Sequence, residues 1–127
     1  MSALAPKPVG RYPHFRKVGP FLFLSGIGPR QGGTDDIAQD FEAQCHSVFK
    51  NVQIVLAEAG AKLTDLVDVT VFLTNMKKDF TTYNRIWSEY IKEPTVCRTT
   101  VEVTALPTPI SIELKCLAYL GEGRQEP

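Results

Sequence analysis

The sequence has no excess of charge of either sign, because its 127 residues include 14 Lys and Arg and 14 Asp and Glu. A neutral chain lacks the basic surface on which nucleic-acid binding usually depends, and it gives no sign of a polybasic membrane anchor. No apolar run approaches the ~18 residues of a membrane-spanning helix. We therefore expect a soluble protein that binds neither nucleic acid nor a membrane.

Cysteine is also scarce, and the three that occur are Cys45, Cys97 and Cys116. Their number is odd and no Cys-x-x-Cys or Cys/His cluster is present, so the sequence predicts neither a disulfide framework nor a zinc site. The first residues carry no apolar segment of the kind found in signal peptides. Together these features favour a cytoplasmic protein.

One domain is expected at this length, since domains typically hold ~100–150 residues. Hydrophobic residues make up 43% of the chain and charged residues 22%, which is ordinary for a globular protein with its own core. We expect residues 1–127 to form a single domain. Its ends, 1–9 and 121–127, are expected to be flexible, because proline and polar residues gather there.

The spacing of apolar residues predicts two helices and five strands in the order β-β-α-β-α-β-β. The first helix has an apolar stripe at i, i+4, i+7 spacing and ends before Gly60. The second helix is expected to use Asp79 as its N-cap and to bury Phe80, Tyr83 and Trp87. The predicted strands are 12–18, 21–24, 66–74, 99–105 and 110–120, and the predicted helices are 40–59 and 79–91.

Period-two alternation places apolar side chains on one face of each long strand. In the third strand this face is expected to include Val67, and in the last strand it runs from Ile110 to Ala118. A mixed sheet with two helices on one face is an α+β fold. The other face mixes apolar residues such as Phe72 with polar residues such as Lys115, and this mixture predicts contact with a partner subunit.

The sequence contains no catalytic triad, metal-binding motif or phosphate loop, and its glycines do not form a G-x-G-x-x-G. Two residues stand out as candidates for chemistry. Arg98 opens a strand and is either a surface arginine or a clamp for a carboxylate. Glu113 lies opposite the apolar face of the last strand, where it either pairs structurally or orients a water molecule.

Three further residues carry a weaker signal. His14 lies in the segment Arg-Tyr-Pro-His-Phe-Arg at 11–16, which is either a polar edge strand or part of a site. His46 lies beside the apolar stripe of the first helix and is expected to be structural. Cys97 is expected to be inert packing, because no base that would activate a thiol is visible beside it.

Residues 98–107, Arg-Thr-Thr-Val-Glu-Val-Thr-Ala-Leu-Pro, followed by Ile-Glu-Leu at 112–114, resemble the signature of the Rid (YjgF-type) family of enamine and imine deaminases. Phe-Leu-Ser-Gly at 23–26 and the strand at 69–73 support the resemblance, which covers nearly the whole chain. It implies a chorismate-mutase-like α+β fold and a homotrimer, with helices outside and sheets forming a central barrel. It also implies active sites in clefts between subunits.

The resemblance assigns roles to individual residues. Arg98 matches the arginine that holds the substrate carboxylate, and Glu113 matches the glutamate that positions the hydrolytic water. No metal or organic cofactor is expected, because an imine carbon is already electrophilic and positioning supplies much of the rate. The other matching positions are Tyr12, which closes the pocket, Gly26 and Thr100, which provide backbone contacts, and the pocket asparagine Asn84.

The segments 11–16 and 25–30 are similar to those of one branch of the family, the 2-aminomuconate deaminases of bacterial aromatic catabolism. Two departures from the general pattern alter the pocket wall. Ile27 stands where the family often has Gln, and Thr100 stands where it often has Cys. Both departures weaken the resemblance to the general deaminases of 2-aminoacrylate.

The charges of the first third of the chain agree with this branch. 2-Aminomuconate is a dicarboxylate, so its second carboxylate needs a second donor, which Arg30, Arg11 or His14 offers. Residues 1–34 hold five Lys and Arg and no Asp or Glu, which suits a small dianion.

The predicted reaction is hydrolysis of 2-aminomuconate, through its imine, to 4-oxalocrotonate and ammonia. Three alternatives stay open at this point. The chain could be a general deaminase of 2-aminoacrylate that protects pyridoxal phosphate enzymes, or a non-enzymatic trimer that binds small ligands or client proteins. A ribonuclease is the weakest alternative, since the chain is neutral and lacks an RNA-stacking motif.

Overall fold

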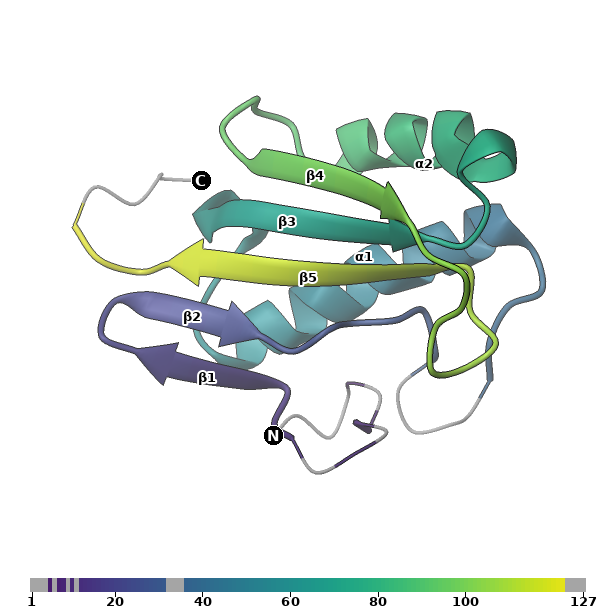
Figure 1. Ribbon diagram of the computed structural model, residues 1–127. Coiled ribbons are helices and arrows are strands. Elements are labelled where there is room, and N and C mark those ends of the chain that lie inside the picture. Colours follow the sequence, from purple (N-terminus) through teal and green to yellow (C-terminus); the bar gives the residue numbers. More distant parts are fainter. Residues whose placement is uncertain (1–4, 6, 9, 11, 32–35, 123–127) are drawn as a thin grey trace.

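The computed structural model describes residues 5, 7, 8, 10, 12–31 and 36–122. Five strands form one sheet, and both helices lie on the same side of it (Figure 1). The predicted α+β class, the mixed sheet and the order of elements are confirmed. The elements are β1 Phe15–Val18, β2 Phe21–Leu24, α1 Phe41–Glu58, the 3-10 helix η1 Leu63–Asp65, β3 Leu66–Leu73, α2 Met76–Tyr90, β4 Cys97–Glu102 and β5 Ile112–Tyr119.

The strands lie in the order β1-β2-β5-β3-β4. All neighbours are antiparallel except β3 and β4, which are parallel and are joined by the crossover helix α2. The strand limits differ from the predicted ones by at most three residues. This order leaves β4 at one edge of the sheet, with only β3 beside it among the described strands.

The core fills the space between the sheet and the helices. The predicted apolar face of β5 is confirmed, because Ile112, Leu114, Cys116 and Ala118 are all buried. The helix α1 meets it with a stripe that includes Cys45, Val48, Phe49, Val52 and Val55.

The limits of α1 agree with the prediction. Asp40 is the N-cap, and its carboxylate accepts a hydrogen bond from the Ala43 backbone N–H at 3.1 Å. Gly60, just beyond the end, has a φ of 77°, a conformation that a residue with a side chain rarely adopts.

The start of α2 was predicted incorrectly. The helix begins at Met76 and its N-cap is Asn75, whereas Asp79 lies buried inside the helix. Phe80 is also less buried than predicted, with 37% of its surface exposed. The buried face is centred on Tyr83 and Ile86, so Phe80 lies at its border and contacts Tyr83 edge-on.

Val67 was predicted to share the apolar face of the third strand, and this is wrong. Its side chain is 38% exposed, while the preceding Leu66 is buried. The pairing of β3 with β5 shifts between Leu66 and Asp68, as in a β-bulge, and the extra residue reverses the alternation at this point.

The sheet face opposite the helices remains uncovered in the single chain. Phe21 and Phe23 on this face are 41% and 44% exposed. Among the described residues, no helix has both the length and the apolar character needed to cross a bilayer. The ends predicted to be flexible, 1–9 and 121–127, fall mostly outside the described residues, although Ala5 is described and belongs to the core.

The N-cap of α2 can be tested directly. The Asn75 side chain accepts a hydrogen bond from the Lys78 backbone N–H at 3.1 Å. Asn75→Ala should therefore lower the free energy of unfolding by about 1 kcal/mol in a urea titration at fixed protein concentration. Asn75→Ser keeps a capping oxygen and should retain most of the stability. Equal stability of the Ala and Ser variants would contradict the assignment.

Candidate active site

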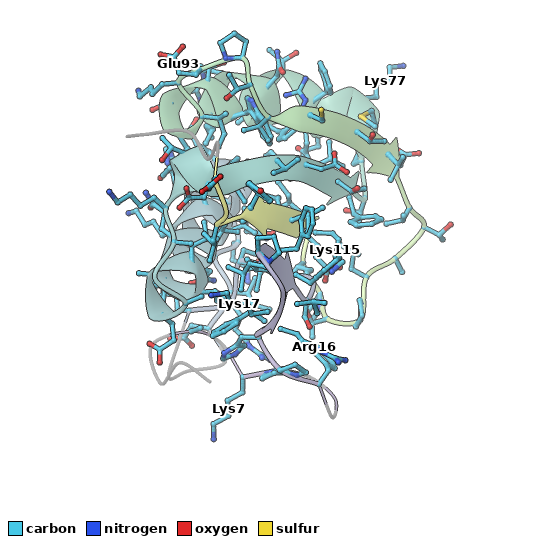
Figure 2. All side chains as sticks on the ribbon, turned by 90° about the vertical axis from the view of Figure 1, so that its left-hand side faces the viewer. Lys7, Arg16, Lys17, Lys77, Glu93 and Lys115 are labelled. Atoms are coloured by element: carbon cyan, nitrogen blue, oxygen red, sulfur yellow. The ribbon has the colours of Figure 1, made fainter. Side chains whose placement is uncertain are left out.

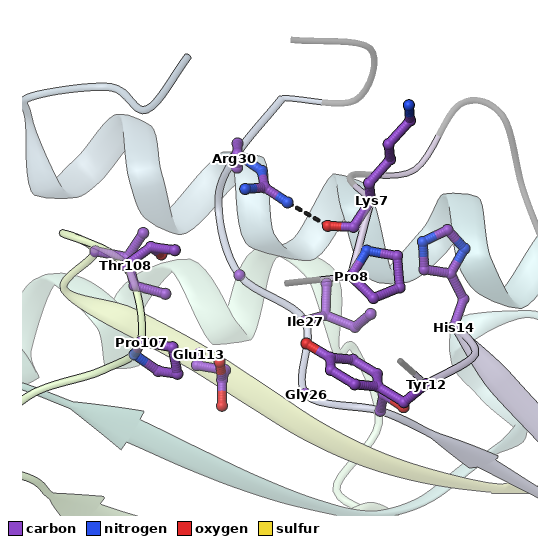
Figure 3. Close-up of a pocket in the computed structure, with 13 residues that line it drawn as sticks. Lys7, Pro8, Tyr12, His14, Gly26, Ile27, Arg30, Pro107, Thr108 and Glu113 are labelled. Carbon is purple, nitrogen blue, oxygen red and sulfur yellow. Dashed lines mark hydrogen bonds between the residues drawn. The ribbon is translucent and has the colours of Figure 1, made fainter. Parts of the chain in front are cut away.

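A pocket lies where the chain leaves β2 (Figure 3). It is lined by the N-terminal segment, the loop that follows β2, the loop that precedes β5, and Glu113 of β5 itself. The sequence-predicted residues that it brings together are Tyr12, His14, Gly26, Arg30 and Glu113, and we call these five the acid pocket.

Glu113 lies on β5, on the uncovered face of the sheet, and it is half-buried. Burial raises the pKa of its carboxyl above the ordinary value, because desolvation disfavours the charged form. Gly26 lies directly beside it, and a Cβ atom at Gly26 would come within 2.7 Å of Glu113 Oε2. A glycine is therefore required there if the carboxylate is to keep its position.

The loop that carries Gly26 is fixed to the core by main-chain and side-chain bonds. Ile27 and Leu114 exchange two backbone hydrogen bonds, with N···O distances of 2.8 and 2.9 Å. The buried Asn51 of α1 donates from Nδ2 to the carbonyl oxygens of Gly28 and Arg30, at 2.9 and 2.7 Å. Asn51 was not among the predicted site residues, since its only signal in the sequence is an amide within the buried stripe of a helix.

Arg30 and His14 form one side of the pocket, and Arg30 brings a positive charge to it. The Arg30 guanidinium donates to the backbone carbonyl of Lys7, and His14 is 4% exposed. The Lys7 ammonium points away from the body of the protein (Figure 2), so Lys7 contributes its carbonyl oxygen and not its charge. Arg11, the third residue predicted to bind the second carboxylate, lies outside the described residues.

A second group of predicted residues gathers around Arg98 on β4. Its guanidinium donates from Nη1 to Asn84 Oδ1 at 2.9 Å, and Thr100 Oγ1 lies 2.8 Å from the Tyr83 hydroxyl. The guanidinium carbon lies 5.0 Å from the centre of the Trp87 ring and 5.3 Å from that of Tyr83. We call Arg98, Asn84, Thr100, Tyr83 and Trp87 the arginine platform.

The aromatic members of this platform were predicted only as core residues. Tyr83 is fully buried, but Trp87 is half-buried and meets the Arg98 guanidinium at the edge of the core. Tyr83 and Trp87 are four residues apart and so lie on one face of the helix, and Tyr83 precedes the predicted pocket residue Asn84. This spacing is the signal that could have placed them in the site.

The acid pocket and the arginine platform do not meet within one chain. On β3, Val69 pairs with Arg98 while Phe72 pairs with Glu113. Val69 and Phe72 are three residues apart on β3 and therefore point to opposite faces of the sheet. Their partners Arg98 and Glu113 lie on those same opposite faces. They are also separated by β3, which lies between β4 and β5.

The chemistry available at these two places is that of a carboxyl base and a guanidinium clamp. No cluster of His, Cys, Asp or Glu suited to a metal ion occurs in the part of the chain that the structure describes. His46 contacts the Tyr90 hydroxyl at 2.9 Å between the two helices. Cys97 was expected to be packing, and this is wrong: it is exposed on the uncovered face of the sheet, opposite Asp68 in the β3–β4 register.

Comparisons with known proteins agree with the fold and with the sequence signature. The family model named Endoribonuclease L-PSP matches residues 2–120. A RutC family protein of Pyrococcus abyssi is 41% identical over 116 residues, which cover 91% of both chains. A protein of Dermatophagoides farinae named 2-iminobutanoate/2-iminopropanoate deaminase is 30% identical over 120 residues, covering 94% of this chain and 93% of the relative.

Solved structures resemble the whole chain. The crystal structure of RidA from an Antarctic Psychrobacter has a TM-score of 0.89 and 32% identity, and the match covers 94% of this chain and 96% of that one. Escherichia coli TdcF with bound serine has a TM-score of 0.85 and 28% identity over 94% and 95% of the two chains. The chain therefore belongs to the Rid (YjgF, L-PSP) family, which includes enamine and imine deaminases.

Proposed function

We propose that this protein is a hydrolytic deaminase of enamines and imines derived from 2-amino acids. The observation that carries the proposal is the half-buried Glu113, which packs against Gly26 in a pocket and has a raised pKa. A carboxylate with a raised pKa is a stronger base than an exposed one, and it suits the removal of a proton from water near neutral pH.

The reaction follows from these groups without a cofactor. Arg98 binds the carboxylate beside the amino-bearing carbon, and the enamine tautomerises to the imine. Glu113 takes one proton from a water molecule, whose oxygen forms a bond to the imine carbon. Glu113 passes this proton to the imine nitrogen, which gives the carbinolamine, and the proton of the carbinolamine hydroxyl then moves to the nitrogen as the C–N bond breaks. Ammonia leaves, the carbon becomes the carbonyl of a 2-oxo acid, and Glu113 is again a carboxylate.

We infer that two copies of the chain share each site, and the position of Arg98 and Glu113 on opposite faces of one sheet supports this. A closed ring of three subunits supplies this pairing, with the acid pocket of one copy facing the arginine platform of the next. The uncovered sheet face supports this assembly. Its exposed Phe21 and Phe23 would otherwise leave large apolar side chains in water.

We further propose that the substrate is 2-aminomuconate and the product 4-oxalocrotonate, in the cytoplasmic breakdown of aromatic compounds. Arg98 takes the carboxylate next to the amino group, which leaves Arg30 and His14 in the acid pocket for the second carboxylate. A second candidate is a small monocarboxylate imine, since a relative is named for 2-iminobutanoate and 2-iminopropanoate. The two candidates differ in their need for Arg30.

Subunit complementation tests the shared site. Arg98→Ala and Glu113→Gln homotrimers should each lose on the order of 100-fold in activity, because each lacks one essential contact. Co-expressed with different tags, the two variants should recover about a quarter of the wild-type activity, since random assembly leaves that share of interfaces with both residues intact. Mixed assemblies that stay inactive would contradict the shared site.

Gly26→Ala tests the position of the Glu113 carboxylate. The new Cβ atom must displace Glu113 Oε2, so kcat should fall on the order of 10-fold or more while the melting temperature changes little. Gly28→Ala is the matched control in the same loop, because its Cβ atom meets Ile110 Cδ1 at 3.0 Å and not Glu113. Equal activity of the two variants would argue against Glu113 as the base.

Arg30→Gln tests the substrate. Loss of one charge-assisted contact should raise KM for 2-aminomuconate by roughly 10- to 100-fold and leave KM for 2-iminopropanoate nearly unchanged. Lys17→Gln, which removes an exposed cation of β1 outside the pocket lining, is the charge-matched control. If Arg30→Gln affects both substrates equally, the dicarboxylate proposal fails and the monocarboxylate candidate takes its place.

A further inference from the structure

We propose that Trp87 is a positioning residue that, together with Tyr83, holds the Arg98 guanidinium in the orientation that binds a substrate carboxylate. The inference rests on the proposed function, since it concerns the clamp of that site. The inference gives Trp87 and Tyr83 of α2 a role in substrate affinity in addition to their role in core packing.

The starting observation is that Arg98 is held in place although it is exposed on the edge strand β4. An exposed arginine normally samples many rotamers, and binding a ligand then costs the entropy of fixing them. Here the guanidinium carbon lies 5.0 Å from the Trp87 ring centre and 5.3 Å from the Tyr83 ring centre. Both distances are within the range of cation–π attraction.

The two rings are themselves firmly held. Tyr83 is fully buried, and its hydroxyl is hydrogen-bonded to Thr100 on the same strand as Arg98. Trp87 packs edge-on against the Phe49 ring of α1 at 6.0 Å between centres. The rings come from positions four apart on α2, so they lie on one face of the helix and both reach β4.

The strand that carries Arg98 is also tied to the helix that carries the rings. The Glu102 carboxylate at the end of β4 accepts a hydrogen bond from the Met76 backbone N–H at 2.8 Å, at the start of α2. This contact, with the Tyr83–Thr100 bond, fixes β4 against α2 at two points. The guanidinium therefore meets rings that cannot easily move away from it.

The held Arg98 guanidinium keeps donors that can bind a substrate carboxylate. A guanidinium has five N–H groups, and the Asn84 contact uses one nitrogen of the fork. The aromatic rings hold the guanidinium by cation–π contact, and donors of the fork remain for a carboxylate. A held guanidinium binds a carboxylate at a smaller entropic cost, so removing a ring should weaken binding more than it slows the chemical step.

Three variants of α2 separate positioning from packing. Trp87→Leu should raise KM about 5- to 10-fold with a much smaller change in kcat, and Trp87→Phe should restore most of the affinity because it keeps a ring. Tyr90→Leu is the matched control: Tyr90 is half-buried on the same helix and stacks on Phe49, where it contacts His46 and not Arg98. It should lower the melting temperature by a similar amount and leave KM unchanged.

The Arg98→Ala background provides a second comparison. If Trp87 acts through Arg98, Trp87→Leu should have no further effect on KM once Arg98 is absent. A change in KM of the same size in both backgrounds would overturn the inference. So would a Tyr90→Leu variant whose KM rises as much as that of Trp87→Leu.

A binding measurement keeps the inference separate from the proposed function. Pyruvate carries the carboxylate and the 2-oxo group of a deamination product, and its dissociation constant can be measured by calorimetry. Trp87→Leu should raise that constant by the same 5- to 10-fold, which is roughly one cation–π contact, and Tyr90→Leu should not. If no imine is turned over but this difference is found, the proposed function fails and the positioning role stands. If pyruvate binding does not weaken in Trp87→Leu, the positioning role is overturned.

Discussion

The alternation of side chains along β3 is the constraint on which the rest of the structure depends. This strand pairs with β4 on one side and with β5 on the other, so its pleat sets which residues of both neighbours share a face. It directs Arg98 to the face that α2 covers and Glu113 to the uncovered face. A shift of one residue in the β3–β5 register would turn Glu113 to the other face, and the hydrophobic side chains of β5 prevent it because they would have to leave the core.

Much of this was predictable because it follows from local patterns. The alternation of β5 and the stripe of α1 identified the layers, and the segment from Arg98 to Pro107 identified the family. The errors arose where tertiary contacts override the pattern. The bulge at Val67 depends on how β3 pairs with β5, and the start of α2 at Asn75 depends on a cap that competes with Asp79 for the same role.

Which residues belong to the site was easier to predict than how they contact one another. Nothing in the spacing of Asn51 indicates that its amide reaches two carbonyl oxygens of a loop more than 20 residues away. The contact of Arg98 with Trp87 likewise depends on the crossover that brings α2 back onto β4. Such contacts join elements that are distant in sequence, and periodicity describes only one element at a time.

The separation of Arg98 from Glu113 has a chemical consequence for the proposed shared site. A guanidinium within a few ångströms of a carboxylate lowers the carboxyl pKa and pairs with it, which would weaken the base and occupy the clamp. Within one chain the two groups lie on opposite faces of the sheet, and the Glu113 pKa is raised by burial with no cation among its causes. Arg98 is instead held by neutral rings and an amide, which support its charge without neutralising it. In the proposed trimer, the substrate lies between the two groups, with its carboxylate on Arg98 and its imine carbon within reach of the water on Glu113. Within one chain the fold therefore keeps the clamp from neutralising the base, and the proposed trimer brings the two to opposite sides of the substrate site.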